Sequence, residues 1–311
     1  MENIFSYYKG KRVVVLGARG YLGSMLCPLL AQAGAEVKAL AKDGGDITTA
    51  DFWQQVFVEP VDVIFHLAAY ESREPDARLD LKVNALSVLE CLEAAKNLPA
   101  KPRIVFMSSS NLAGIASGLP VNEKTPDNPM TIYAIHKLLA ENYLYHYRTN
   151  LNIKSMTLRL ANVYGPSATA DLSKRVAVNK IAAKAAEGGS LELYENKNKA
   201  RDFLYMTDAL NALLLAGEFC ERAGSRHYVV GSGERTDFES ITTILASIAE
   251  ERLGEKLSIL ESDTELPLVE MREFVADSAL FKELTGWQAK VQLKEGLEKT
   301  FDYFFSENKS Q

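Results

Sequence analysis

A tyrosine and a lysine four residues apart are the side chains in this sequence best placed to do chemistry together. Tyr133 and Lys137 lie near the start of a stretch, Thr131 to Asn150, that reads as one long helix. A spacing of four puts both side chains on one helical face. A phenol is a poor acid–base catalyst at neutral pH because its ordinary pKa is about 10, and a nearby ammonium stabilises the phenolate. In isolation such a pair is usually structural, so its meaning depends on its surroundings.

Three consecutive hydroxyls lie upstream of this pair. Ser108, Ser109 and Ser110 follow the apolar run Arg103 to Met107, which reads as a strand. The carboxyl ends of parallel strands are where such sheets bind ligands. One of these hydroxyls could therefore hydrogen-bond a substrate oxygen beside the tyrosine, although a polar exit from a strand explains any single serine equally well.

A glycine-rich loop follows the first expected strand, Val13 to Leu16. It reads Gly17-Ala18-Arg19-Gly20-Tyr21-Leu22-Gly23, and a helix is expected from Tyr21 to Ala33. Glycine is needed at the tight turn, where the backbone nears a pyrophosphate, and where the helix packs on the strand. The helix then offers free N–H groups and its positive dipole end to the phosphates. The context between strand and helix predicts dinucleotide binding.

The end of the second expected strand, Glu36 to Leu40, bears on which dinucleotide is bound. An acidic side chain there accepts hydrogen bonds from a ribose 2′-OH, whereas a basic one accommodates a 2′-phosphate. Here Lys42 comes first and no acid occurs until Asp43, while Arg19 could face the same phosphate. The two cations favour NADP(H) and leave NAD(H) possible; ordinary solvated surface charges are the alternative.

Short apolar strands alternate with amphipathic helices, which predicts a parallel sheet covered on both faces. We therefore expect an α/β fold: a doubly wound dinucleotide-binding domain over 1–170, and a smaller mixed α/β substrate-binding region over 171–311. Segments near 203–232 are expected to return to the first domain. The other expected elements are strands at Val61–Leu67, Lys154–Leu160, Leu191–Leu193 and Tyr228–Val230, and helices at Leu79–Lys96, Ser173–Glu187 and Thr236–Leu253.

Composition narrows the class of protein. The 311 residues are 47% hydrophobic and 24% charged, with a net charge of −6, which argues against a nucleic-acid or anionic-membrane binder. Cys27, Cys91 and Cys220 are widely spaced and fit neither a disulfide framework nor a zinc site, so we expect no metal. Without a leader-like N-terminus or a spanning segment, a cytoplasmic location is expected.

These features together resemble the extended short-chain dehydrogenase/reductases, in the branch of NAD-dependent epimerases and dehydratases that modify nucleotide sugars. The resemblance runs from the glycine loop to about Trp287. Its landmarks are the Gly17–Gly23 loop, Gly45-Asp46-Ile47-Thr48, His66-Leu67-Ala68-Ala69, Asn84, the triple serine, Tyr133–Lys137, Leu158-Arg159-Leu160-Ala161-Asn162-Val163-Tyr164-Gly165-Pro166 and Arg201-Asp202-Phe203.

The resemblance implies a role for each matching residue. Ser109, Tyr133 and Lys137 would be catalytic, with Ser110 as the alternative serine. Arg201 would grip a nucleotide or diphosphate, for which a guanidinium fork is suited, or else form an ion pair with Asp202. The cofactor would meet Gly17, Arg19, Gly20, Tyr21, Leu22, Gly23, Lys42, Asp46, Ile47, Leu67, Ala68, Ala69, Asn84, Ser108, Tyr133, Lys137 and Val163, and the substrate Ser109, Ser110, Asn111, Asn162 and Arg201.

Two departures from the family pattern affect the chemistry. Asn111-Leu112-Ala113-Gly114 stands where relatives usually carry Val-Tyr-Gly, so the pocket near the sugar ring is expected to differ. Dehydratases and decarboxylases of this branch place an acid just after the catalytic serine or threonine. Ser110 and Asn111 occupy those positions, so elimination lacks its expected acid.

The leading hypothesis is reduction of a nucleotide-linked keto sugar, of the 4-keto-6-deoxyhexose type, by NADPH. Tyr133 would donate the proton, Lys137 would assist it and hold the ribose, and Ser109 would orient the carbonyl. The alternatives are a nucleotide-sugar epimerase with tightly held NAD, and a non-catalytic NADP(H)-binding sensor or scaffold. None of the histidines is assigned a catalytic role.

A homodimer is expected from two amphipathic helices, Leu79–Lys96 and Thr131–Asn150, which match the pair that forms the dimer interface in relatives. The second carries Tyr143, Tyr145 and Tyr147, and aromatic residues are enriched at interfaces. The same helix could instead pack on the chain's own sheet.

Overall fold

The computed structural model describes residues 6–72 and 76–310. Its main sheet has six strands, all parallel, in the order β2-β1-β3-β4-β5-β9. The strands are β1 (Arg12–Leu16), β2 (Glu36–Leu40), β3 (Val63–His66), β4 (Arg103–Ser109), β5 (Ser155–Leu160) and β9 (Tyr228–Val230).

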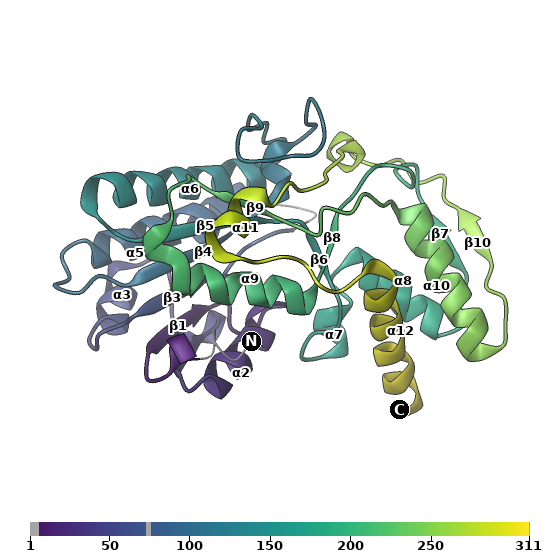
Figure 1. Ribbon diagram of the computed structural model, residues 1–311, viewed down its shortest axis with the longest axis horizontal. Helices are drawn as coiled ribbons and strands as arrows, with labels where there is room; N and C mark the ends of the chain where they lie inside the picture. The colour runs from purple at the N-terminus through teal and green to yellow at the C-terminus, as the bar shows by residue number, and fades with distance from the viewer. Residues whose placement is uncertain (1–5, 73–75, 311) are drawn as a thin grey trace.

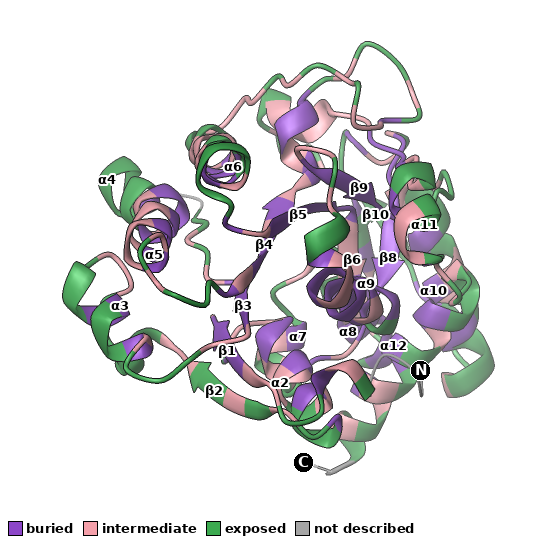
Figure 2. Ribbon diagram, turned by 60° about the vertical axis from the view of Figure 1, so that its left-hand side comes forward, coloured by how far each residue is buried: buried purple, intermediate pink, exposed green. Residues whose placement is uncertain are grey.

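Both faces of this sheet are covered by helices. Consecutive residues of its central strands are apolar and point to opposite faces, so each face needs a helical cover. In β1, Val13 and Val15 join one buried core and Val14 and Leu16 join another. Helices α2 (Gly23–Gln32) and α9 (Met206–Phe219) cover the first face, and α3 (Ala50–Val56), α5 (Ser87–Ala95) and α6 (Ile132–Leu151) cover the second (Figures 1 and 2). The sequence prediction of a doubly wound parallel sheet is confirmed.

A second group of elements lies beside the sheet layer (Figure 1). Three helices share a third apolar core with Tyr164 and Phe203: α8 (Ala177–Ala186), α10 (Phe238–Leu253) and α12 (Leu293–Ser310). Two small parallel sheets complete it, one of β7 (Leu191–Leu193) with β10 (Ile259–Glu261), the other of β6 (Asn162–Tyr164) with β8 (Phe203–Tyr205). Further along the chain, α9 packs on β4 and β5, and β9 pairs with β5 of the main sheet.

Two expected helices differ in detail from the prediction. The helix expected over Leu79–Lys96 is present, but it consists of α4 (Ala77–Leu81), one π-helical turn η2 (Lys82–Leu86) and then α5 without a break. The stretch Ser173–Glu187 is divided between the end of α7 (Ala170–Ser173) and α8. The Ser173 hydroxyl donates to Thr169 O and accepts from Ser167 N. The remaining elements are α11 (Ala279–Thr285) and the 3-10 turns η1 (Lys42–Gly44), η3 (Ser110–Ala113), η4 (Cys220–Arg222) and η5 (Leu268–Met271).

In the part of the chain that the structure describes, no helix is both long and apolar enough to cross a bilayer.

Candidate active site

The predicted site residues lie at one edge of the sheet, because the strands that carry them are parallel. The glycine loop follows β1, Leu67 to Ala69 follow β3, Ser109 ends β4, and Asn162 comes just after β5. The carboxyl edge of such a sheet is its usual ligand site.

The glycine loop is shaped by close backbone approach. Gly17 has a φ of +77°, and a Cβ there would lie 2.8 Å from Ala68 N. A Cβ on Gly23 would lie 2.2 Å from Gly17 O. The loop thus packs against the segment after β3, which brings two predicted cofactor segments together. A backbone cradle that excludes side chains fits a dinucleotide pyrophosphate.

Tyr21 links this loop to the second group of elements. Its hydroxyl donates to Gly165 O at 2.7 Å and receives a bond from Asn179. Burial raises the pKa of Tyr21. Leu22 is buried in the core below the loop. Tyr21 therefore holds the glycine loop against the chain that follows Val163.

The cations predicted to choose the cofactor are exposed. Arg19 Nη1 lies 2.7 Å from Asp43 Oδ2, and both side chains are largely in solvent. Lys42 opens the turn η1 and is exposed as well. Asp46 accepts bonds from Thr48 N and Oγ1, which lower the pKa of Asp46. Ile47 offers its carbonyl to Trp53, so this segment is fixed to α3.

Lys137 is fully buried under Tyr133. Its Nζ donates to Met107 O at 2.9 Å and lies 4.5 Å from the centre of the Phe106 ring and 5.8 Å from that of Tyr133. Burial lowers the pKa of Lys137 to about 8, against the opposing effect of Glu71. The structure thus places the Lys137 ammonium beside the phenol ring of Tyr133.

The pKa of Tyr133 is raised, whereas the sequence led us to expect that Lys137 would stabilise the phenolate and lower it. Burial raises the pKa of Tyr133, and the carboxylate of Glu71 raises it further, while the side-chain hydrogen bond with Ser109 lowers it. Tyr133 therefore rests as a phenol, which is a proton donor.

The three serines have different partners. Ser108 is buried, and its hydroxyl donates to Glu141 Oε1. Ser109 accepts from Asn111 N at 3.1 Å and reaches Tyr133, whereas Ser110 is buried in η3. These contacts favour Ser109 over Ser110 as the serine that orients a substrate carbonyl.

Glu141 is a buried residue of the site that the sequence prediction missed. It lies one turn after Lys137, and Arg159 binds it through Nε to Oε1 (2.9 Å) and Nη2 to Oε2 (2.7 Å). Arg159 Nη1 also lies 2.6 Å from Asp127 Oδ1. This ion-paired cluster fixes β4, β5 and α6 to one another behind the serines. Its signal in the sequence was the spacing of four from the lysine.

Asn84, predicted at the cofactor, holds the chain after Ala69. Its Oδ1 accepts from Tyr70 N at 3.0 Å, and its Nδ2 donates to Tyr70 O at 2.7 Å. Asp80 and Glu71, which sequence reasoning also missed, lie close enough to Lys137 and Tyr133 to influence both.

Arg201 is brought near the site but its guanidinium is turned into the protein. It is 2% exposed, and its donors bind the backbone oxygens of Ala200, Glu270 and Arg272. Burial lowers the pKa of Arg201 to about 10. Asp202 is not its ion-pair partner; it accepts from Ser232, Gly233 and Ala276 instead. Asn162 donates to Asp202 O at 3.2 Å.

Comparison with known proteins shows the family of the chain. The family described as "NAD dependent epimerase/dehydratase family" matches residues 13–231. The chain is 28% identical to UDP-glucose 4-epimerase of Mycolicibacterium smegmatis, over 96% of this chain and 100% of the relative. It is 27% identical to GDP-6-deoxy-D-mannose reductase of Pseudomonas aeruginosa, over 92% of this chain and 95% of that one.

Among solved structures, the UDP-glucose 4-epimerase of Thermotoga maritima with UDP-glucose is similar, with a TM-score of 0.82 and 25% identity. The match covers 96% of this chain and 99% of that one.

Proposed function

Because the chain belongs to the NAD-dependent epimerase/dehydratase family, whose members include nucleotide-sugar epimerases, reductases and decarboxylases, we propose that it is an NADP(H)-dependent reductase of a nucleotide-linked keto sugar. The substrate type is a 4-keto-6-deoxyhexose. A bound NADPH supplies the hydride. Tyr133 gives its proton to the carbonyl oxygen, Ser109 orients that oxygen, and Lys137 holds its charge beside the phenol.

The observation that carries this proposal is the placement of Tyr133 between Ser109 and Lys137. The phenol shares a hydrogen bond with Ser109, and Lys137 Nζ lies 5.8 Å from the centre of the Tyr133 ring. Burial and Glu71 raise the pKa of Tyr133, so its side chain is a phenol that can donate a proton to a carbonyl oxygen. The same three residues can serve an epimerase, so cofactor handling has to separate the two reactions.

Elimination and decarboxylation fit this site less well. Both need an acid or base beside the reacting carbon, and the residues after Ser109 are Ser110 and Asn111. Ser110 is buried within η3. The Asn111 amide does not titrate and cannot replace a carboxylate as a base.

NADPH is favoured over NADH by the charges at the adenosine end. Arg19 and Lys42 are exposed there, and the Arg19–Asp43 ion pair is in solvent and therefore weak. A 2′-phosphate competes readily for such an arginine. The backbone cradle at Gly17 and Gly23 accommodates either cofactor.

Nucleotide-sugar epimerisation is the second candidate, and the M. smegmatis epimerase, similar over its full length, supports it. The two are separated by cofactor handling. We expect purified protein to release no stoichiometric NAD on denaturation, and to oxidise one NADPH per sugar reduced in a panel of GDP-, UDP- and dTDP-linked 4-keto-6-deoxyhexoses. One tightly bound NAD per chain, with turnover of UDP-glucose and no net oxidation, would establish the epimerase instead.

Tyr133→Phe tests both candidates. It removes the proton donor, so turnover should fall by about 10³-fold while NADPH binding persists. Tyr194→Phe, at an exposed tyrosine outside α6, is the control and should retain full activity.

We also propose a homodimer through α4 and α6. Leu79, Leu81, Ile135 and Tyr145 are each about 40% exposed on these two helices, an apolar surface typical of an interface. Tyr147 does not contribute, because it packs inside the chain and its hydroxyl bonds Glu93. Light scattering should give twice the chain mass, and Ile135→Glu should give the monomer.

A further inference from the structure

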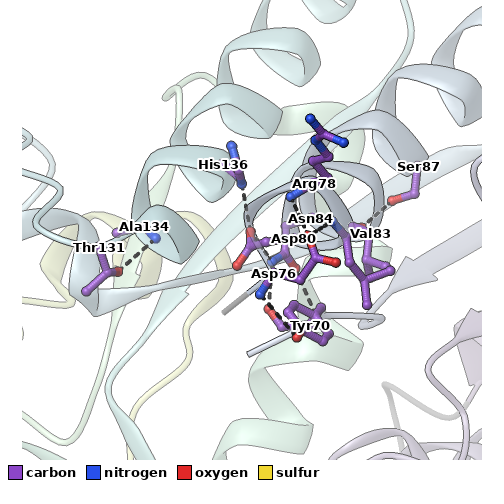
Figure 3. A network of polar contacts seen from close by, with 11 residues as sticks. Tyr70, Asp76, Arg78, Asp80, Val83, Asn84, Ser87, Thr131, Ala134 and His136 are labelled. Carbon is purple, nitrogen blue, oxygen red and sulfur yellow. Dashed lines mark hydrogen bonds and ion pairs between the residues drawn. The ribbon is translucent and has the colours of Figure 1, made fainter. Parts of the chain in front are cut away.

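A chain of hydrogen bonds connects the segment after β3 to the first turn of the catalytic helix (Figure 3). The Asn84 amide holds Tyr70 through both backbone groups. Asn84 Nδ2 also donates to Asp80 Oδ1 at 2.8 Å. The same carboxylate oxygen bonds His136 Nδ1 at 2.8 Å. We call this set, Tyr70, Asn84, Asp80 and His136, the brace.

The middle of the brace is buried. Asp80 is 1% exposed and the His136 side chain 13%. A carboxylate only accepts, so the His136 Nδ1 must be the donor in this bond. An ionised acceptor makes both of its hydrogen bonds stronger and shorter than neutral ones. Asp80 is therefore the residue that joins the two ends of the brace.

The two ends of the brace lie beside the groups that the proposed reaction must hold in place. Tyr70 directly follows Ala68 and Ala69, and Gly17 packs on Ala68. His136 immediately precedes Lys137 and is one turn beyond Tyr133. Through its bonds to Asn84 and His136, Asp80 therefore fixes the distance between the segment after β3 and the start of α6.

The local helix geometry makes this link possible. Asn84 lies in the π-helical turn η2, a rare form that is frequent at functional sites. Asp76 caps the start of α4 by accepting from Arg78 N and Leu79 N, and its own N–H reaches the Tyr70 hydroxyl at 3.5 Å. Tyr70 is thus held at both its backbone and its side chain, and the α4–η2 segment is anchored against it.

We propose that Asp80 and His136 are positioning residues, which set the distance between the Tyr133–Lys137 pair and the cofactor segment after β3. The proposal rests on the proposed role of Tyr133 and Lys137. Neither Asp80 nor His136 reaches the reacting atoms in this scheme; they act through Asn84 and through helix α6.

The expected signature is a loss of turnover with little loss of binding. A displacement of about 1 Å in a reacting group can cost on the order of 10²-fold in rate. None of the four brace residues belongs to the glycine loop, so we expect NADPH binding to persist. His136→Ala should therefore lower kcat by about tenfold or more and leave the NADPH Kd and the sugar KM within about threefold.

Three variants separate positioning from general damage. His136→Asn keeps a donor near the place of Nδ1 and should restore kcat to within about threefold of wild type. Asp80→Asn removes the charge at nearly constant volume and should resemble His136→Ala. The double variant should be no slower than the slower single one, because both act through one bond. His146→Ala, at an exposed histidine nearly three turns further along α6, is the control without effect.

The measurements are kcat per NADPH-binding site, NADPH Kd by fluorescence, and amide hydrogen exchange of 67–72 and 132–137. Exchange should rise in both segments of His136→Ala and stay unchanged in 17–23. A kcat within twofold of wild type, multiplicative double-variant losses, or unchanged exchange would each overturn the brace. The outcome does not depend on the reaction type. If the wild-type protein is an epimerase, the same variant-to-wild-type kcat ratios are measured on epimerisation. If it turns over no substrate, amide hydrogen exchange alone tests the proposal.

Discussion

Two buried cations, Lys137 and Arg201, mark the two halves of the proposed site, and they are used differently. Lys137 is fully buried, and within the described chain its one hydrogen bond goes to Met107 O. Arg201 is equally buried, but it binds three backbone oxygens. An ammonium with three donors and one acceptor retains capacity for a ligand, whereas three of the five guanidinium N–H donors of Arg201 are bonded to the backbone. Burial alone does not distinguish a functional cation from a structural one; the partners do.

The largest expected effect is that of Lys137→Met on turnover. Removing the ammonium leaves Tyr133 without its neighbouring positive charge, so kcat should fall by about 10² to 10³-fold. Because a buried charge is costly, the free energy of unfolding should not decrease. Kinetics and denaturant unfolding of the same sample check both parts. A strong loss of stability would mean that Lys137 resembles Arg201.

Arg201→Met should show the opposite pattern. It leaves the carbonyls of Glu270 and Arg272 unpaired, so the free energy of unfolding should fall by about 2 kcal/mol. The kcat of the folded fraction and the sugar KM should change by less than about threefold. A KM increase of 30-fold or more at unchanged stability would instead support the phosphate-binding role expected from the sequence.

The pH dependence of kcat should sharpen the contrast. Since the pKa of Lys137 is lowered to about 8, its ammonium is present below that pH and is lost above it. Activity should decline by about tenfold from pH 7 to pH 9. The stability contribution of this group has the opposite sign: between pH 8 and its usual 10.5 the unfolded state binds more protons, so folding is favoured as pH rises. If kcat and the free energy of unfolding both fell as the pH rises above 8, the lowered pKa of Lys137 would be contradicted.

The smallest effect is expected at the exposed cations. Lys42→Ala should raise the NADPH Kd by about fivefold and leave the NADH Kd unchanged, with stability altered by less than about 0.5 kcal/mol. Asp43→Ala frees Arg19 and should lower the NADPH Kd by a few-fold. Equal effects on both cofactors would remove the argument for NADP(H).

The contrast also shows what the sequence could predict. The glycine loop, the parallel sheet and the Tyr133–Lys137 pair depend on local spacing and backbone geometry, so they could be recognised from a few adjacent residues. The direction in which the Arg201 guanidinium points depends on carbonyls about 70 residues further along the chain. Asp80 meets His136 across 56 positions. No local pattern encodes such contacts, nor the π turn at Asn84 inside a helix that was expected to be regular.

The most direct test of the account follows the hydride and the proton together. NADPH carrying deuterium at the nicotinamide C4 is incubated with a nucleotide-linked 4-keto-6-deoxyhexose and the protein, and the sugar is analysed by mass spectrometry. The account predicts one deuterium per product, one NADP⁺ formed for each, and neither with Tyr133→Phe. A product without deuterium, formed with no NADPH oxidised, or full turnover by Tyr133→Phe would contradict it.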